Sequence, residues 1–234
     1  MAGKKILIGG CSFSESQKHL HKYGFNEGRD WIPWTDLLQD EFGNSNTIIN
    51  TARGSSGQSN IVSLLSKKLL ELDFDVDMVV VQWSNTSRLF TEKESDLIEK
   101  IQSQGYDLLS SKGIDIFTEE SRNQIEKMGY DITFNSLLQI YLFKNLLESK
   151  NIDYRFFWGW SMHERICSYE LYNKHILNDK FLLFGPPDDV KEGGMHDYAN
   201  LVLGEEKTEV DDGHPNSAAH RVFYDDIIKP LLFG

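Results

Sequence analysis

Four short apolar runs divide the chain, and each is followed by polar or small residues. They cover residues 6–8, 47–50, 77–83 and 153–158, and the third is the strongest of the four. Runs of this length without strict alternation are typical of strands buried on both faces of a parallel sheet. We therefore expect four strands whose carboxyl ends lead into polar loops, with the first and third of them buried.

The segments between these runs carry apolar residues at helical spacing. This spacing predicts helices within residues 31–42, 61–72 and 134–150, and a closing helix over 217–228. Pro33 suits a first helical turn, and Gly43 suits a helix end. Strands that alternate with helices favour an α/β fold, here a three-layer α/β/α sandwich with a mostly parallel central sheet.

Two segments lack a clear period. Residues 89–131 are charged and punctuated by glycines, and we expect an insertion that carries short helices. Residues 159–204 are expected to form a long variable connection, of a length often associated with function. Neither a repeat nor a linker is visible, and 234 residues with 40% hydrophobic content suit one core. The expectation is a single domain over residues 1–234.

Composition narrows the classes of partner. The chain carries 24 basic and 36 acidic residues, a formal net charge of −12. This charge opposes binding to nucleic acid and to anionic membranes. No apolar run is long enough to span a bilayer and no signal-peptide pattern is seen, so a cytoplasmic location is expected. The two cysteines suggest neither a disulfide framework nor a Cys-rich metal site.

Residues from the two ends of the chain can supply one catalytic site. Ser12 follows the first predicted strand and a pair of glycines, which places it at the carboxyl edge of a parallel sheet. A serine hydroxyl becomes a nucleophile when an imidazole takes its proton and a carboxylate orients that imidazole. Asp211 and His214 lie three positions apart just before the closing helix. Together they provide a nucleophile, a base and an orienting acid.

Donors for a developing oxyanion are expected at the same sheet edge. The Ser12 amide, a glycine amide between residues 54 and 57, and the Asn85 side chain all follow predicted strand ends. Cys11 precedes Ser12, and a small packed cysteine is expected there rather than a thiol nucleophile.

Four short blocks, in the same order, resemble the SGNH hydrolases, which are also called GDSL-type esterases and lipases. The blocks are Gly10-Cys11-Ser12-Phe13-Ser14, Ser56-Gly57-Gln58-Ser59-Asn60, Trp83-Ser84-Asn85 and Asp211-Asp212-Gly213-His214-Pro215. The resemblance implies a flavodoxin-like fold with Ser12 as nucleophile and oxyanion donor. It also implies an oxyanion hole completed by Gly57 and Asn85, and a triad completed by Asp211 and His214.

Two departures from the family pattern bear on the substrate. Cys11 stands where the family usually has aspartate, and Trp83 stands where it has glycine. Both changes keep the reacting atoms, but the substrate preference does not carry over with them.

Two assignments within the blocks stay open. Gly54 competes with Gly57 as the glycine donor, and the polar residues that follow position 57 favour Gly57. Asp212 competes with Asp211 as the orienting acid, although it would have to fold back over a shorter span.

The remaining histidines and acids form no set of three or four ligands at a known metal-binding spacing, so neither a metal nor a cofactor is expected. Trp158 and Trp160 follow a strand end, where they could stack on a sugar or acyl group, but core packing is the favoured expectation. Arg53 lies beside the second block, where it suits either an anionic substrate or a surface ion pair.

These residues lead to the hypothesis of a cofactor-independent serine esterase. An acyl-enzyme would form on Ser12 and be hydrolysed by water that His214 activates. Small-molecule or carbohydrate esters with small acyl groups, such as acetyl, are the expected substrates. Two alternatives remain, namely acyl transfer to an acceptor other than water and a non-catalytic module that binds a glycan or protein. The sequence does not indicate an oligomeric state.

Overall fold

Five parallel strands form the central sheet of this computed structural model, in the order β2-β1-β3-β6-β7. They are β1 (Lys5–Gly9), β2 (Thr47–Asn50), β3 (Met78–Trp83), β6 (Asp153–Trp158) and β7 (Phe181–Leu182). The structure describes residues 3–17, 31–54, 56–86, 109–111, 114–116, 131–160, 164–184, 193–204 and 214–233. All four predicted strands are present at their expected places.

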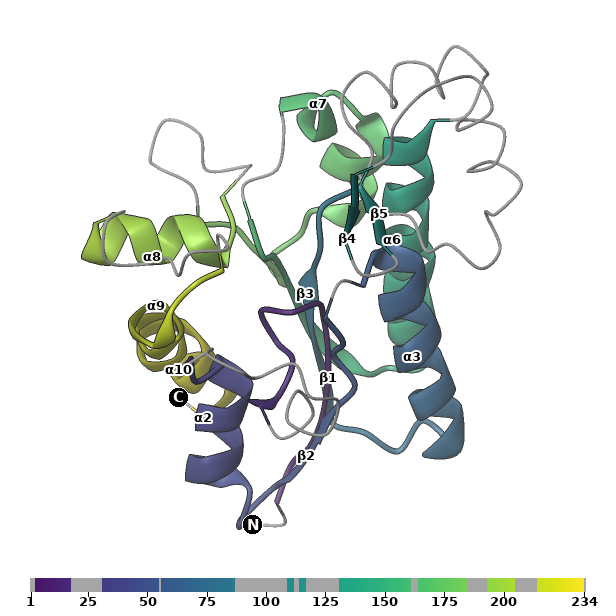
Figure 1. Ribbon diagram of the computed structural model, residues 1–234. Coiled ribbons are helices and arrows are strands. Elements are labelled where there is room, and N and C mark those ends of the chain that lie inside the picture. The colour runs from purple at the N-terminus through teal and green to yellow at the C-terminus, as the bar shows by residue number, and fades with distance from the viewer. Residues whose placement is uncertain are drawn as a thin grey trace.

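Helices cover both faces of this sheet and give three layers (Figure 1). One face carries α3 (Gln58–Glu71) and α6 (Ile132–Ser149). The other carries α2 (Trp34–Phe42), α8 (Met195–Leu203), α9 (Ser217–Phe223), the π-helical turn η4 (Tyr224–Ile228) and α10 (Lys229–Phe233). The short elements α7 (Glu164–Cys167) and η2 (Tyr172–Ile176) come before β7. The expected three-layer α/β/α fold class is confirmed.

Strand β3 lies at the centre of the sheet, and every one of its residues is buried. Val79 and Val81 pack with the apolar side chains of α3 and α6, whereas Val80 packs with those of α2 and α9. Alternate side chains of a strand point to opposite faces, so a central strand must be apolar on both. Gln82 is the exception on the face that contains Val80, and it is also fully buried.

The connection between β6 and the closing helix holds more regular structure than its sequence indicates. Within residues 159–204, the described residues form α7, η2, β7 and α8. Strand β7 has two residues, which is too short for a period to be detected. It is nevertheless paired in register with the edge of β6, Phe156 with Phe181 and Phe157 with Leu182.

Most of residues 89–131 lie outside the described residues. The described part contains β4 (Leu109–Ser111) and β5 (Ile114–Ile116), which pair antiparallel. The short helices were expected somewhere within the segment, and its described part between residues 109 and 116 forms these two strands. The segment ends at Asp131, whose side chain accepts a hydrogen bond from the Phe134 amide at 2.8 Å and so caps the first turn of α6.

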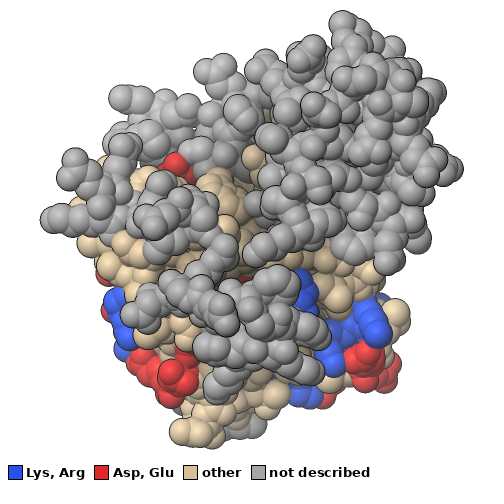
Figure 2. Space-filling model, in the orientation of Figure 1, with Lys and Arg blue, Asp and Glu red and all other residues tan. Residues whose placement is uncertain are grey.

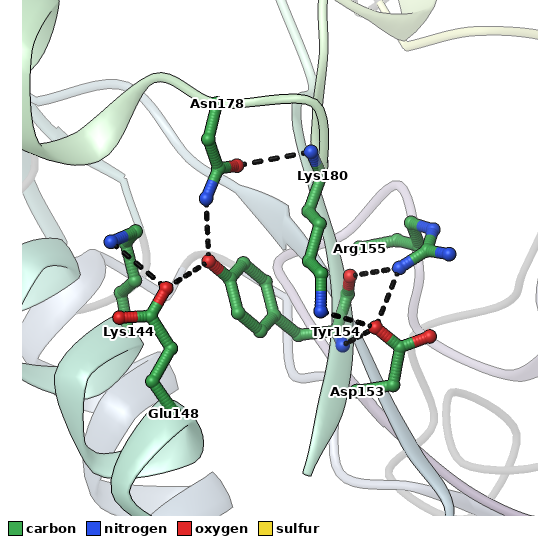
Figure 3. Close-up of polar contacts among 7 residues, drawn as sticks. All are labelled: Lys144, Glu148, Asp153, Tyr154, Arg155, Asn178 and Lys180. Carbon is green, nitrogen blue, oxygen red and sulfur yellow. Dashed lines mark hydrogen bonds and ion pairs between the residues drawn. The ribbon is translucent and has the colours of Figure 1, made fainter. Parts of the chain in front are cut away.

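A polar network fixes the amino end of β6 to α6 and to the loop before β7 (Figure 3). The Tyr154 hydroxyl donates to Glu148 Oε1 at 2.8 Å, and Asp153 Oδ1 pairs with Arg155 at 2.8 Å and Lys180 at 2.7 Å. Burial opposes ionisation of Asp153, but the Lys180 and Arg155 contacts outweigh it and lower the pKa of this carboxyl. This network lies at the sheet edge opposite the strand ends that carry the candidate site.

The charged side chains on the face shown in Figure 2 are of both signs and lie next to one another. On α3, Lys68 and Glu71 form an ion pair of 2.6 Å one turn apart. Exposed pairs of this kind contribute little to stability. Within the described ranges, none of the helices combines the length and apolar character needed to cross a bilayer.

Candidate active site

Ser12 lies in a tight turn that follows β1. The Ser14 amide donates to the Cys11 carbonyl at 3.0 Å and closes the turn, with Ser12 at its second position. Gly10 allows this turn to lie close against β3, because a Cβ atom at this position would lie 3.0 Å from Ser14 Cβ and 3.1 Å from the Gln82 carbonyl oxygen. The Ser12 residue is 9% exposed, so its hydroxyl lies in a largely enclosed position.

His214 reaches this turn from the other end of the chain. Its Nε2 atom lies 2.9 Å from Ser12 Oγ, although the two residues are 202 positions apart. Two residues later, the Asn216 side chain accepts from the Ala219 amide at 3.0 Å and caps α9. This cap fixes the point from which the His214 segment leaves the helix. With Nε2 unprotonated, the Ser12 hydroxyl can donate its proton to the imidazole.

Three aromatic rings surround the His214 imidazole. Trp31 lies edge-to-face with it at 5.0 Å between ring centroids, Phe13 lies at 5.6 Å and Trp160 at 6.5 Å. Such contacts restrict the orientation of the imidazole and exclude water from its sides. Trp158, which was expected to pack in the core, is fully buried and donates through Nε1 to the Tyr172 hydroxyl at 2.9 Å.

A second imidazole, His220, lies on α9 behind Trp31. It is fully buried, its ring packs 5.4 Å from that of Trp31, and its Nδ1 atom accepts from the Trp34 amide at 3.3 Å. Burial, together with the nearby His214, lowers the pKa of His220 to about 3. His220 is therefore neutral at physiological pH, with its proton on Nε2. No sequence pattern marks this role of His220, because it depends entirely on the packing of α9.

The second and third sequence blocks lie side by side after β2 and β3. Gly57 is the residue from which α3 begins, and the Gln58 side chain at the start of that helix donates to the Ser84 carbonyl at 2.5 Å. Asn85 follows Ser84 directly and is partly exposed. The Gln58 contact thus holds the residues expected to supply oxyanion donors against one another.

The two candidate glycines differ in what their amides do. The Gly54 amide donates to Glu15 Oε2 at 2.6 Å. By contrast, among the described residues the Gly57 amide has no acceptor, and neither has the Ser12 amide. Burial raises the pKa of Glu15, against the lowering effects of the Gly54 amide and the Arg53 guanidinium. Glu15 is a buried acid next to the site that the sequence blocks did not single out.

The remaining candidate residues from the sequence lie either outside the described residues or in contacts that do not involve catalysis. Asp211 and Asp212 lie outside the described residues. Cys11 is fully buried, with Sγ 3.2 Å from Gln82 Oε1 and 3.9 Å from Ser12 Oγ, as expected for a packed cysteine. Arg53 donates to the carbonyl of Ala52 at 2.7 Å. No group of three or more His, Cys, Asp or Glu side chains placed to hold a metal ion occurs in the part of the chain that is described.

Comparison with known proteins identifies the fold but no sequence family. Neither a family model nor a curated protein matches the sequence. Among solved structures, the chain is similar to the psychrotrophic esterase EstA from Pseudoalteromonas sp., with 14% identity and a TM-score of 0.51 over 99% of this chain and 100% of the other.

It is also similar to Axe2, an acetylxylan esterase from Geobacillus stearothermophilus, solved as a catalytic mutant. Here the identity is 11% and the TM-score 0.51, over 100% of this chain and 96% of the other. At these identities the likeness concerns the fold, and it extends over nearly the whole length of all three chains.

Proposed function

We propose that this protein is a serine esterase of the SGNH-hydrolase type. The observation that carries the proposal is the 2.9 Å contact between Ser12 Oγ and His214 Nε2, formed between the two ends of the chain at the carboxyl edge of a parallel sheet. A nucleophile and a base within hydrogen-bond reach are the minimum that acyl transfer requires. The first sequence block contains Ser12 and the fourth contains His214, and the four blocks follow one another in the order typical of that family.

In the proposed reaction His214 shuttles one proton. Nε2 takes the proton of Ser12 as Oγ attacks the ester carbonyl carbon, and the imidazolium then gives it to the departing alcohol oxygen as the ester C–O bond breaks. Water attacks the resulting acyl-enzyme in the same manner, with its proton passing to Nε2 and then back to Ser12 Oγ. A carboxylic acid and the regenerated serine are the products.

For the orienting acid we propose Asp211, with Asp212 as the alternative. The three-residue spacing to His214 allows the carboxylate to reach the imidazole nitrogen that does not face Ser12, namely Nδ1. Axe2 was solved as catalytic mutants of a serine, an aspartate and a histidine, and the last two are also three positions apart. That parallel supports Asp211.

For the oxyanion hole we propose the amides of Ser12 and Gly57 with the side chain of Asn85. The Gly54 amide is engaged by Glu15, whereas the amides of Ser12 and Gly57 have no acceptor among the described residues. Donors that are held in place without an acceptor in the resting protein can stabilise a developing negative charge without first breaking another bond.

The proposed substrates are esters of small acyl groups, with acetylated carbohydrates among the candidates. Ser12 is nearly enclosed and three aromatic rings surround its base, which favours a small acyl group over a long chain. One of the solved structures of similar fold is an acetylxylan esterase, which supports the same class.

An esterase assay on matched variants tests this proposal. Activated esters from acetyl to decanoyl and acetylated xylo-oligosaccharides are offered to wild type, Ser12→Ala and His214→Gln, with Ser16→Ala as a control serine in the same segment. We expect a preference for the shortest acyl groups and a loss of kcat of about 10³-fold or more in both site variants, with the control unchanged.

Three results would redirect the proposal. Full activity in Ser12→Ala would contradict the mechanism. Appearance of the acyl group on an added alcohol or sugar instead of on water would indicate a transferase on the same site. Absence of turnover in folded wild-type protein would favour a binding module.

A further inference from the structure

One buried amide holds the turn that carries the proposed nucleophile. Gln82 lies at the carboxyl end of β3, on the sheet face where Val80 and Phe157 are packed, and none of its surface is exposed. Burying a primary amide in apolar surroundings is unfavourable unless its hydrogen bonds are made. The partners of Gln82 therefore explain why the central strand keeps a polar residue here.

The side-chain oxygen of Gln82 contacts both ends of the turn. Oε1 accepts from the Cys11 amide at 3.3 Å, from Cys11 Sγ at 3.2 Å and from Ser14 Oγ at 3.3 Å. Cys11 and Ser14 are the first and last residues of the turn, and Ser12 lies between them. One atom on the rigid central strand thus fixes the segment on both sides of the nucleophile.

A second chain of contacts orients Ser14 itself. The Trp34 indole Nε1 donates to Ser14 Oγ at 3.1 Å, which leaves the hydroxyl proton directed to Gln82. The Ser14 carbonyl accepts from Asn50 Nδ2 at 2.7 Å and from Thr35 Oγ1 at 3.2 Å. Side chains from α2 and β2 therefore complete the support that Gln82 begins.

Gly159, which directly follows β6, leaves room for the Gln82 amide. Gln82 Nε2 donates to the Trp83 carbonyl at 2.7 Å, and the Gly159 amide donates to the same oxygen at 2.9 Å. A Cβ atom on Gly159 would lie 2.3 Å from Gln82 Nε2. Glycine at position 159 thus provides the space that the amide occupies, and the donor end of Gln82 is fixed as firmly as the acceptor end.

We propose that Gln82 is a positioning residue for the nucleophile, an inference that rests on the function proposed above for Ser12. The hydrogen bonds of its side-chain oxygen go to Cys11 and Ser14, so it acts through these two residues on either side of Ser12. Its function is to keep Ser12 Oγ at hydrogen-bond distance from His214 Nε2. A displacement of about 1 Å in a reacting atom can reduce turnover about 100-fold. Removing the hydrogen bonds of Gln82 should therefore lower kcat.

The test compares Gln82→Met and Ser14→Ala with a control variant that also loses hydrogen bonds but lies away from the site. Methionine keeps the length of the side chain but removes both hydrogen-bonding atoms, and Ser14→Ala removes one donor to the same oxygen. Tyr154→Phe is the control, because it loses two hydrogen bonds in the polar network at the opposite sheet edge. For each variant kcat, KM, the pH profile and the melting temperature are measured.

For Gln82→Met we expect kcat to fall about 10- to 100-fold, with KM within about twofold of wild type and the shape of the pH profile retained. Ser14→Ala should show a smaller loss of the same kind, and Tyr154→Phe should lower the melting temperature without lowering kcat.

The contrary outcomes are distinct. If wild type is active, and if kcat falls no more in Gln82→Met and Ser14→Ala than in Tyr154→Phe, then Gln82 supports only the fold and the inference is wrong. If Gln82→Met does not fold, Ser14→Ala decides by the same criterion. If folded wild type turns over no ester, the proposed esterase fails, and the inference fails with it.

Discussion

At the scale of single residues, the two imidazoles next to Trp31 have opposite tasks. His214 lies against Ser12 and exchanges a proton in the reaction proposed above, whereas His220 is fully buried and accepts from the Trp34 amide through Nδ1. A protonated His220 would lose that acceptor and place a charge in the apolar layer. Its neutral state is therefore a condition for packing α9 against α2.

The buried, neutral state of His220 predicts that the folded protein loses stability as the pH is lowered. The pKa of His220 is about 3 in the folded protein against 6.5 for an ordinary histidine. The unfolded chain consequently binds a proton that the folded protein does not, and stability is lost as the pH falls from about 6.5 toward 3. The slope from this one group approaches about 1.4 kcal/mol per pH unit.

The measurement is urea unfolding near pH 7 and near pH 5 for wild type, His220→Asn and the exposed-histidine control His175→Asn. Asparagine can still accept from the Trp34 amide but does not titrate. We expect a shallower loss of stability on acidification in His220→Asn than in the other two proteins. Equal slopes in all three would contradict a neutral buried His220.

Individual residues differ in how far the sequence reveals them. Ser12 and His214 belong to short blocks whose order and spacing carry chemical meaning, and the structure brings their side chains to 2.9 Å. Gln82, His220 and Glu15 could not be found in this way. Their roles depend on which atoms surround them after folding, and a glutamine in a strand or a histidine in a helix has no local pattern to mark it.

At the scale of elements, the approach of α3 to β1 depends on a glycine. A Cβ atom on Gly9 would lie 2.5 Å from Leu65 Cδ1 and 2.7 Å from its Cγ, both within a fully buried side chain. Gly9 is the last residue of β1, three positions before Ser12. The glycine therefore sets the distance between the nucleophile-bearing strand and the helix that begins at the second block.

We expect Gly9→Ala to destabilise the protein by about 1–3 kcal/mol through overpacking. Leu65→Ala alone should cost about 2–5 kcal/mol because it leaves a cavity. In the double variant the new methyl group occupies part of that cavity, so the combined loss should be smaller than the sum. Urea unfolding of the four proteins measures this coupling, and simple additivity would show that the two side chains do not compete for the same space.

The elements that the sequence predicts best are those with one dominant environment. Strand β3 is a continuous buried run and β6 ends in three consecutive buried residues, whereas α6 carries an apolar period over five turns, so their patterns are unambiguous. Strand β7 and helix α8 were not predicted. The first has two residues and gains its structure from pairing with β6, and the second begins after Gly194 in a segment of mixed polarity.

At the scale of the whole molecule, the parallel sheet explains how distant blocks meet. Ser12 follows β1, Gly57 follows β2 and Asn85 follows β3, and these three strands are neighbours that run in the same direction. Their carboxyl ends consequently form one edge of the sheet. His214 reaches that edge from the segment that precedes α9, on the face that also carries α2.

Because Ser12 and His214 come from opposite ends of the chain, the proposed mechanism requires that Ser12 is activated only in the folded protein and only through His214. An organophosphorus reagent is a suitable probe of this requirement. A fluorophosphonate reacts with activated serines and leaves other hydroxyl groups unmodified.

The most direct measurement is therefore fluorophosphonate labelling followed by intact mass and peptide mapping. We expect a single adduct on Ser12 in folded wild type, strongly slowed labelling in His214→Gln, and no adduct in Ser12→Ala or in urea-unfolded protein. Failure of folded wild type to react, or equal labelling of Ser12→Ala, would contradict the proposal that Ser12 and His214 form the catalytic centre of an esterase.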